Sequence, residues 1–347
     1  MKRPRFLNPR FHSPSRVAGW PTPDAGAKSD TFLLTQTDGA RNSDALFYVI
    51  WREGGGFFSI LSSVLGHLQI AERLGAIPVV DMQNFPSTYS DRAPVNGSLN
   101  AWTYYFEPVS DVDLDEVYES TNFLVCSGRH PGGVTTNMST DVGLLTTFDK
   151  FIRLNAATQS HVDNVAADIH PDSRTLGVHY RGHEQRTAPA HPYPPTLGQV
   201  IPLVRKILDE SDFDRIFLVT EGQEYLDAFK KAFGERLHYT EGARGYKKNA
   251  YLEYPRPLHM FHLGLEVLTD TLLLSTCGGI VSGNSNVSEA AILLSRGGYR
   301  VNYQIDLGLN SNRRFRARYL WSMKSLLPQR LGGFPSTLEW NARDIAS

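Results

Sequence analysis

The residues best suited to chemistry lie where a short apolar run ends, in Leu176-Gly-Val-His179-Tyr-Arg181-Gly-His-Glu184. On an extended strand, His179 and Arg181 are two residues apart and therefore point to the same face. An imidazole beside a guanidinium suits a base edge or a hydroxyl that lies next to a phosphate. The alternative is an ordinary strand end with a surface arginine and a half-buried histidine, and these residues alone leave both interpretations open.

Two further predicted strand ends carry polar residues. One ends in Thr220-Glu221, and the other, Ser-Gly-Asn-Ser285-Asn286, runs directly into a helix. Hydroxyl and amide side chains at a helix start cap the helix, and the same position binds phosphate through backbone N–H groups and the positive helix end. Arg181 would supply the matching cation. The pattern therefore predicts a pyrophosphate site that needs no Asp-x-Asp metal pair.

Three consecutive glycines, beginning with Gly54 and Gly55, connect a predicted strand (46–51) to a predicted helix (57–74). Their spacing is not the G-x-G-x-x-G of dinucleotide sites, and no Walker sequence occurs. The glycines nevertheless let a backbone or a ligand approach closely, and the helix start offers free N–H groups. Glu53, just before the glycines, lies at the crevice end of its strand, unless it is a solvated loop charge.

Composition sets the limits on function. The chain has 347 residues, a hydrophobic fraction of 41% and a charged fraction of 20%, which are typical of a soluble globular protein of two domains. A net charge of -1 argues against a general nucleic-acid surface. The two cysteines form no metal or redox pattern, no apolar stretch is long enough to span a membrane, and no signal peptide is recognised. We therefore expect a cytoplasmic protein, without a metal and without nucleic acid as a partner.

Strands and helices alternate along most of the chain, which specifies parallel sheets covered on both faces. We expect order to begin near Ala45 and predict two doubly wound, Rossmann-type α/β domains (31–170 and 171–310) that face a cleft. Residues 1–30 are predicted to be poorly ordered, and the tail (311–347) to pack back on the domains. The predicted strands are 46–51, 77–81, 123–126, 175–180, 215–220, 237–240, 279–282 and 299–304; the predicted helices are 57–74, 197–208, 224–233, 258–275 and 287–294, with a more polar helical pattern over 142–169.

Two segments have more than one interpretation. Residues 100–107 (Asn-Ala-Trp-Thr-Tyr-Tyr-Phe-Glu) are aromatic, as expected of a packed core, although aromatic faces also suit sugar rings. The tail contains four arginines between residues 313 and 318, followed by Tyr319-Leu-Trp. This basic stretch is either a solvated helix face or a surface that packs across both domains or meets an anionic partner. Peripheral contact with a membrane is therefore one of the alternatives for this stretch.

The order and spacing of these motifs resemble the GDP-fucose-dependent fucosyltransferases of GT-B architecture, over residues 45–305. That group includes the α-1,6-fucosyltransferases and, more distantly, the protein O-fucosyltransferases. Its H-x-R-R-x-D strand motif is matched by residues 179–184, its V-x-L-A-T-D-D strand by residues 216–221, and its L-D-x-x-x-L-S motif followed by S-S by residues 269–275 and 285–286. A His-Pro that follows in the α-1,6 type is matched by His191-Pro192.

The resemblance implies an inverting, metal-independent glycosyltransferase that moves fucose from GDP-fucose to a hydroxyl of a glycan or a peptide. Arg181 would bind the β-phosphate and help the leaving group depart. His179 would contact the guanosine and Asp270 the guanine, while Ser285 and Asn286 would hold phosphate. Residues 171–310 would then bind the nucleotide sugar, and residues 31–170 would lie on the acceptor side.

The remaining predicted site residues are Thr220, Gly54 and Gly55 for donor binding, and Glu53 or Glu184 as the catalytic base. Glu53 is similar to an acidic residue of one O-fucosyltransferase type, whereas Glu184 stands in place of the Asp of the strand motif and would otherwise brace the arginine. A base must lie within hydrogen-bond reach of the acceptor hydroxyl.

Besides Glu184 in place of the motif's Asp, the sequence departs from the family at two further places. The second arginine of the strand motif is Gly182, so one cation is absent, and a later glutamate of the α-1,6 type has no counterpart in residues 187–190. These departures leave two alternatives open: a GT-B transferase that uses another nucleotide sugar, and a non-catalytic nucleotide- or glycan-binding protein on the same scaffold. A Rossmann oxidoreductase would need the missing glycine fingerprint.

Overall fold

The computed structural model describes residues 41–52, 54–126, 128, 138–139, 141–183, 185–245 and 255–340, together with the backbone of residues 32–36. The described chain forms two compact units. Unit 1 contains the described residues up to His161 together with Leu258–Leu265. Unit 2 contains those of Val162–Pro257 and of the chain from Glu266 onward.

Unit 2 is built on a five-stranded sheet in which every strand pairing is parallel. The strand order is β7-β6-β5-β8-β9, so the chain starts at the central strand, builds outward on one side and then crosses to the other. Such a reversal leaves a crevice at the carboxyl ends of the two central strands, here β5 and β8. The strands are β5 (Thr175–Tyr180), β6 (Arg215–Thr220), β7 (Leu237–His238), β8 (Gly279–Gly283) and β9 (Val301–Ile305).

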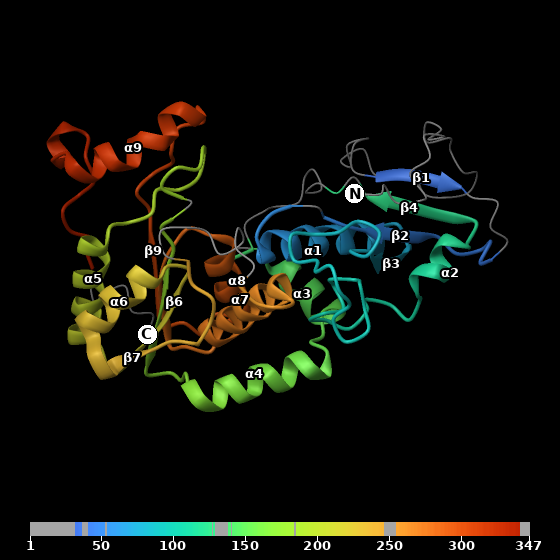
Figure 1. The fold of residues 1–347 in the computed structure, drawn as a ribbon, viewed down its shortest axis with the longest axis horizontal. Helices are drawn as coiled ribbons and strands as arrows, with labels where there is room; N and C mark the ends of the chain where they lie inside the picture. Colours follow the sequence, from blue (N-terminus) through green and yellow to red (C-terminus); the bar gives the residue numbers. More distant parts are fainter. Residues whose placement is uncertain are drawn as a thin grey trace. The chain divides into compact units, whose positions relative to one another are not determined.

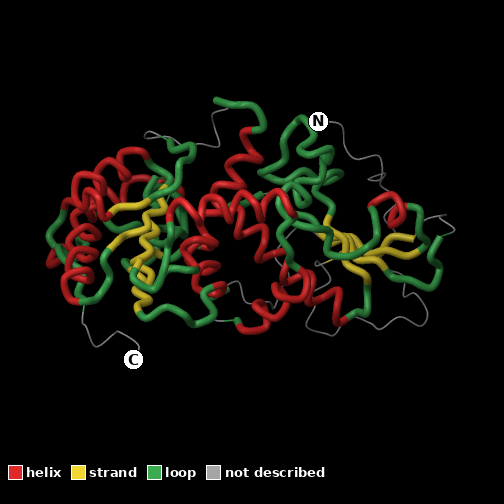
Figure 2. The backbone as a smooth tube through the Cα atoms, turned by 90° about the horizontal axis from the view of Figure 1, so that it is seen from below, coloured by secondary structure: helices red, strands yellow, loops and turns green. Residues whose placement is uncertain are grey.

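Helices cover both faces of this sheet, as Figure 1 and Figure 2 show. On one face, α5 (Leu197–Glu210) and α6 (Gln223–Phe233) form an apolar cluster with alternate strand residues, among them Val178 and Leu218. On the other face, α7 (His259–Ser275) and α8 (Asn286–Leu294) pack against the intervening strand residues, together with part of α4 (Ala156–Ile169). Successive side chains of β6 pack against opposite helix layers, because neighbouring residues of a strand point to opposite faces of the sheet.

Unit 1 contains a four-stranded sheet with the order β1-β4-β2-β3. The strands are β1 (Phe32–Gln36), β2 (Phe47–Ile50), β3 (Ile77–Val80) and β4 (Asn122–Cys126). Strand β2 is parallel to both neighbours, whereas β1 pairs antiparallel with β4 at the edge. Helix α1 (Phe57–Arg73) packs on β2, where the Tyr48 hydroxyl and His67 Nδ1 are 2.9 Å apart. Residues of α2 (Leu114–Tyr118) pack against the other side chains of β2.

The predicted alternation of strands and helices is confirmed, with three differences. Strand β1 precedes the expected start of order near Ala45, and α2 lies in a segment without helical pattern. The helical stretch over 142–169 is two helices, α3 (Val142–Phe151) and α4. Ile152 adopts an extended backbone and Leu154 bridges to Phe106, which draws the chain away from the axis of α3.

The tail after β9 lies within unit 2 and is partly helical. It forms α9 (Arg314–Leu326) and the short helix η3 (Gln329–Leu331), while the other short helix, η1 (Gly234–Arg236), precedes β7. Trp340 and Phe334 of the tail are buried, and the Pro335 carbonyl accepts a hydrogen bond from Gln199 Nε2 of α5 at 2.7 Å. The end of the described tail thus packs on α5.

Candidate functional site

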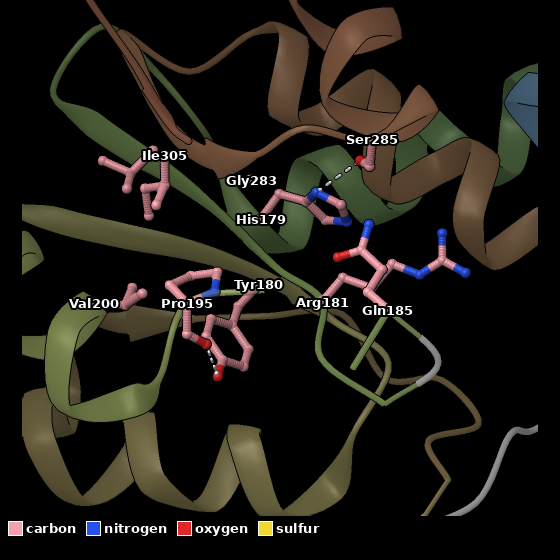
Figure 3. Close-up of a pocket in the computed structure, with 10 residues that line it drawn as sticks. His179, Tyr180, Arg181, Gln185, Pro195, Val200, Gly283, Ser285 and Ile305 are labelled. Carbon is pink, nitrogen blue, oxygen red and sulfur yellow. Dashed lines mark hydrogen bonds between the residues drawn. The ribbon is translucent and has the colours of Figure 1, made fainter. Parts of the chain in front are cut away.

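Three of the predicted residues come together in unit 2, around a hollow at the carboxyl ends of β5 and β8. His179 belongs to β5, Arg181 follows it, and Ser285 begins α8; Figure 3 shows their side chains gathered there beside Gln185. The hollow encloses about 290 Å³, its open mouth to solvent included. It is lined by His179, Tyr180, Arg181, Gln185, Pro195, Val200, Val281, Gly283, Ser285 and Ile305.

His179 is a neutral hydrogen-bonding group at this site. Its side chain is buried, with Nδ1 placed 3.3 Å from the Ser285 hydroxyl (Figure 3). Burial, and after it the positive charge of Arg181, lowers the pKa of His179 to about 3. The imidazole is therefore uncharged near pH 7, and Arg181 supplies the positive charge of the pair.

Ser285 caps α8, as the sequence predicts for a hydroxyl at this position. Its Oγ accepts the N–H of Ser288 at 3.2 Å, and the Ser288 hydroxyl accepts the N–H of Ser285 at 3.1 Å. A nine-residue helix leaves its first-turn amides without intrahelical partners, and the cap takes only the third of them. Because the Ser285 hydroxyl already serves the cap and His179, a phosphate here would be held by the amides of Asn286 and Val287. Asn286 itself is exposed.

Arg181 is held by Glu221, a residue that sequence analysis placed at a strand end without giving it a role. Arg181 Nε donates to Glu221 Oε2 at 3.1 Å, while Oε1 accepts the N–H groups of Gly182 at 3.2 Å and His183 at 2.8 Å. The strand register explains this contact, because Tyr180 pairs with Thr220 and the next residues on each strand are therefore neighbours. One carboxylate thus fixes both the guanidinium and the loop that carries it.

Gly182 is required by the local packing. A Cβ at this position would lie 2.6 Å from the hydroxyl of Tyr225 and 2.9 Å from its ring. Tyr225 is buried, 2% exposed, so it has little room to move. The departure from the R-R motif therefore has a structural cause: an arginine at position 182 would displace an aromatic side chain of the core.

Two buried hydroxyls at the strand ends have no hydrogen-bond partner among the described residues. Ser282 of β8 pairs in register with His179 and so faces the same side of the sheet. Thr220 pairs with Tyr180, and the register places it on the opposite face, toward α5 and α6. Ser282 is 1% exposed and is not among the residues that line the hollow, so its hydroxyl is a buried polar group whose hydrogen bond the described residues do not supply.

Asp270 lies outside the hollow. It belongs to α7, and its Oδ1 accepts a hydrogen bond from the hydroxyl of Thr240, which follows β7, at 2.5 Å. Burial is the largest influence on Asp270, and its pKa is raised to about 6. The hydrogen bond from Thr240 and the charge of Arg244 oppose this rise, whereas the charge of Glu266 adds to it. Arg244 also donates to the Thr240 carbonyl at 2.7 Å. These residues form a second polar cluster, so a guanine contact for Asp270 stays a prediction.

Replacing Asp270 with asparagine is expected to stabilise the protein at neutral pH. Because the pKa is raised on folding, the native state keeps a proton between about pH 4 and 6 that the unfolded chain has lost, and stability falls as pH rises through 6. The amide oxygen of the new side chain would still accept from Thr240, without a charge to bury. We expect a gain of about 1–2 kcal/mol at pH 7.5 that disappears by pH 4, measured by urea unfolding.

The matched control for this substitution is Asp209→Asn, since Asp209 is exposed on α5. That variant should change stability by less than about 0.5 kcal/mol at either pH. If Asp270→Asn lowered the free energy of unfolding equally at both pH values, burial of the Asp270 charge would not be destabilising the protein at neutral pH.

The glycine loop of unit 1 differs in one respect from the sequence-based expectation. Gly55 has a φ of 115°, a conformation that favours glycine, and Gly54 is exposed. However, the Phe57 N–H at the start of α1 donates to the hydroxyl of Tyr89 at 2.9 Å. The prediction that this helix start offers free N–H groups is therefore wrong for its first amide, which the protein itself occupies.

The two predicted catalytic bases, Glu53 and Glu184, lie outside the described residues. The aromatic segment of unit 1 is core, since Trp102, Tyr104 and Tyr105 are each at most 3% exposed. Within the described ranges, no group of three His, Cys, Asp or Glu side chains is arranged to hold a metal ion. Nor is any helix in those ranges both long and apolar enough to cross a membrane.

Comparison with solved structures shows the fold. The chain resembles the α-1,6-fucosyltransferase NodZ soaked with GDP-fucose, with 17% identity and a TM-score of 0.53, over 78% of this chain and 100% of that one. Selenomethionine-labelled NodZ from Bradyrhizobium gives 17% identity and a TM-score of 0.52, over 78% and 99%. No protein-family model and no curated protein sequence matches the chain. The predicted α/β fold class, similar to that of a GT-B fucosyltransferase, is thereby confirmed.

Proposed function

We propose that this protein is an inverting, metal-independent glycosyltransferase that transfers fucose from GDP-fucose to a hydroxyl of a glycan or a peptide. The observation that carries the proposal is the meeting of Arg181, His179 and the start of α8 at the crevice between β5 and β8. These elements supply a cation, a neutral hydrogen-bonding ring and helix-start amides. That combination suits a diphosphate attached to a polar group.

The chemistry follows from where charge develops. As the bond between C1 of the sugar and the diphosphate oxygen breaks, its electrons go to the diphosphate, whose negative charge grows. A guanidinium fixed by Glu221 and amides fixed by the α8 cap need no reorganisation at that moment, so they stabilise the transition state more than the ground state. No metal ion is needed for this step. The neutral His179 would orient the donor without adding charge.

The acceptor hydroxyl attacks C1 from the side opposite the leaving diphosphate, which inverts the configuration there. Its proton passes to a carboxylate base, for which Glu53 and Glu184 remain the candidates. GDP leaves with the bonding electrons, and the fucosylated acceptor is the second product. The glycine loop with Gly54 and Gly55, in the unit that we place on the acceptor side, would give close access to one of the substrates.

Gly182 is a reason to consider nucleotide-sugar donors other than GDP-fucose. The family motif has two adjacent cations and this chain has one, because Tyr225 occupies the space beside position 182. A single guanidinium holds a diphosphate without identifying its base or its sugar. A GT-B transferase that uses another nucleotide sugar is therefore the main alternative, and a non-catalytic binding protein is the other.

A panel of nucleoside diphosphates tests the donor class. GDP at 100 times its dissociation constant should stabilise the chain by about 2.7 kcal/mol and raise its Tm by roughly 4 °C or more. ADP, UDP and CDP at the same concentration serve as controls and should give less than half that shift, and EDTA should leave the GDP shift unchanged. A larger shift with another diphosphate would replace GDP-fucose as the donor, and no shift with any of them would reject a nucleotide site.

A further inference from the structure

Positive charge is concentrated in the tail that carries α9. Six lysines and arginines and no aspartate or glutamate occur between residues 307 and 338, although the whole chain has a net charge of -1. Arg313, Arg314, Arg316 and Arg318 are exposed and form no ion pair within the described part of the chain. Arginines in the first turn oppose the helix dipole, so they do not serve the stability of α9.

The outward face of α9 is apolar. Phe315, Tyr319, Met323 and Leu326 are 79%, 51%, 55% and 85% exposed. Their spacing of four, four and three residues places them in one stripe along the helix. On the helical projection, Arg316 and Arg318 border this stripe on its two sides, where they flank the apolar side chains. Contiguous bulky apolar surface of this kind on a folded protein marks an interaction site.

The opposite face of α9 is attached to unit 2, so the exposed stripe is not a consequence of loose packing. Ala317 is fully buried, and Asn310 Nδ2 donates to its carbonyl at 3.0 Å. Trp321 Nε1 donates to the Pro194 carbonyl at 2.7 Å, and the guanidinium of Arg186 lies 4.2 Å from the centre of a Trp321 ring. Figure 1 shows α9 at one end of unit 2, beyond α5 and β9.

We propose that α9 binds the surface of an anionic lipid bilayer, with its apolar stripe in the headgroup region and its arginines on the lipid phosphates. A helix with aromatic and aliphatic side chains on one face and arginines at the borders has the composition of an interfacial helix. Arginine side chains near an anionic surface are attracted to it, and the attraction decreases within a Debye length. This proposal does not depend on the transferase activity.

A second copy of the chain fits this face poorly. In a two-fold symmetric contact the same patch faces itself. Two sets of arginines would then be brought together without any acidic residue from residues 307–338 to separate them. An anionic bilayer combines an apolar interior with negatively charged headgroups, and so complements both the apolar stripe and the arginines of α9.

Vesicle flotation tests the proposal. The full-length protein is mixed with vesicles of phosphatidylcholine alone or with 30% phosphatidylglycerol, at 0.1 M and 0.5 M NaCl. We expect binding to the anionic vesicles at low salt that is about tenfold weaker with neutral lipid or at high salt, because the arginine contacts are screened.

Two pairs of variants separate α9 from the rest of the surface. Arg316→Gln with Arg318→Gln, the two arginines that border the stripe, should weaken binding about tenfold, whereas Lys231→Gln with Arg236→Gln, two exposed cations elsewhere on unit 2, should not. Leu326→Ser should weaken binding severalfold, and Val142→Ser, which changes a side chain 78% exposed on α3, should not. All four proteins should keep the wild-type Tm, since the altered side chains are exposed.

Three results would overturn the proposal: no binding to anionic vesicles, equal binding to neutral vesicles, or equal loss in the control variants. A fourth contradicting result could come from light scattering of the wild type without lipid. A dimer that Leu326→Ser converts to a monomer would assign the stripe to a second copy of the chain instead.

Discussion

Arg181→Ala is expected to lower the rate of GDP-fucose turnover about 1000-fold, the upper end of the loss seen when one preorganised electrostatic donor is removed. The guanidinium is the charged group that faces the growing negative charge of the diphosphate, since His179 beside it is neutral near pH 7. GDP binding should weaken much less, by about tenfold, because the charge on the ground-state diphosphate is smaller and more evenly spread. The effect should therefore be larger on kcat than on KM.

The measurement is GDP release by the variant and the wild type, with Tm recorded for each. Arg181→Lys keeps a charge without the planar fork and should recover only part of the rate. The matched control is Arg205→Ala, an exposed arginine on α5, which should turn over at the wild-type rate. A fully active Arg181→Ala protein would remove this arginine from the reaction.

Glu221→Ala is expected to reduce kcat/KM about 100-fold, because it releases the arginine and the loop together. The carboxylate accepts two backbone N–H groups of residues 182 and 183 and fixes Arg181 Nε. Its removal leaves those amides without their acceptor, which should cost about 1–3 kcal/mol of stability. Glu221 acts through Arg181 and is a positioning residue.

Glu221→Gln separates the two tasks of this carboxylate. The amide oxygen of glutamine can still accept from the loop, whereas its NH2 group cannot accept from Arg181 Nε. We expect near wild-type stability with a rate between those of wild type and Glu221→Ala. Glu235→Ala, at an exposed position in η1, is the control and should change neither quantity. Equal activity of Glu221→Ala and wild type would show that the contact between Glu221 and Arg181 is not needed for turnover.

Sequence pattern was sufficient for the parallel sheet of unit 2, because its strands are short apolar runs with a helix after each. Strands β5 and β6 begin and end at the predicted residues. Strand β1 was missed because it is an edge strand in a region rich in turn residues, and its stability comes from pairing with β4. The break between α3 and α4 was missed because a distant residue, Phe106, pairs with Leu154.

The candidate site was predictable where residues lie close along the chain, and not where strand register decides. His179 and Arg181 share a strand end, and Ser285 is recognisable as a cap, so all three were found. The contact between Glu221 and Arg181 depends on which residues are opposite one another on β5 and β6. Likewise, no local pattern shows that Tyr225 fills the space beside Gly182.

The proposed site should cleave a sugar from its diphosphate, and the most direct test is the release of GDP from GDP-fucose by the wild-type protein without an acceptor. Water then takes the place of the acceptor hydroxyl, and free fucose and GDP should appear in equal amounts. We expect release that continues in EDTA and is lost in Arg181→Ala. GDP-fucose that binds and is recovered intact, alone or with glycan and peptide hydroxyls present, would contradict it.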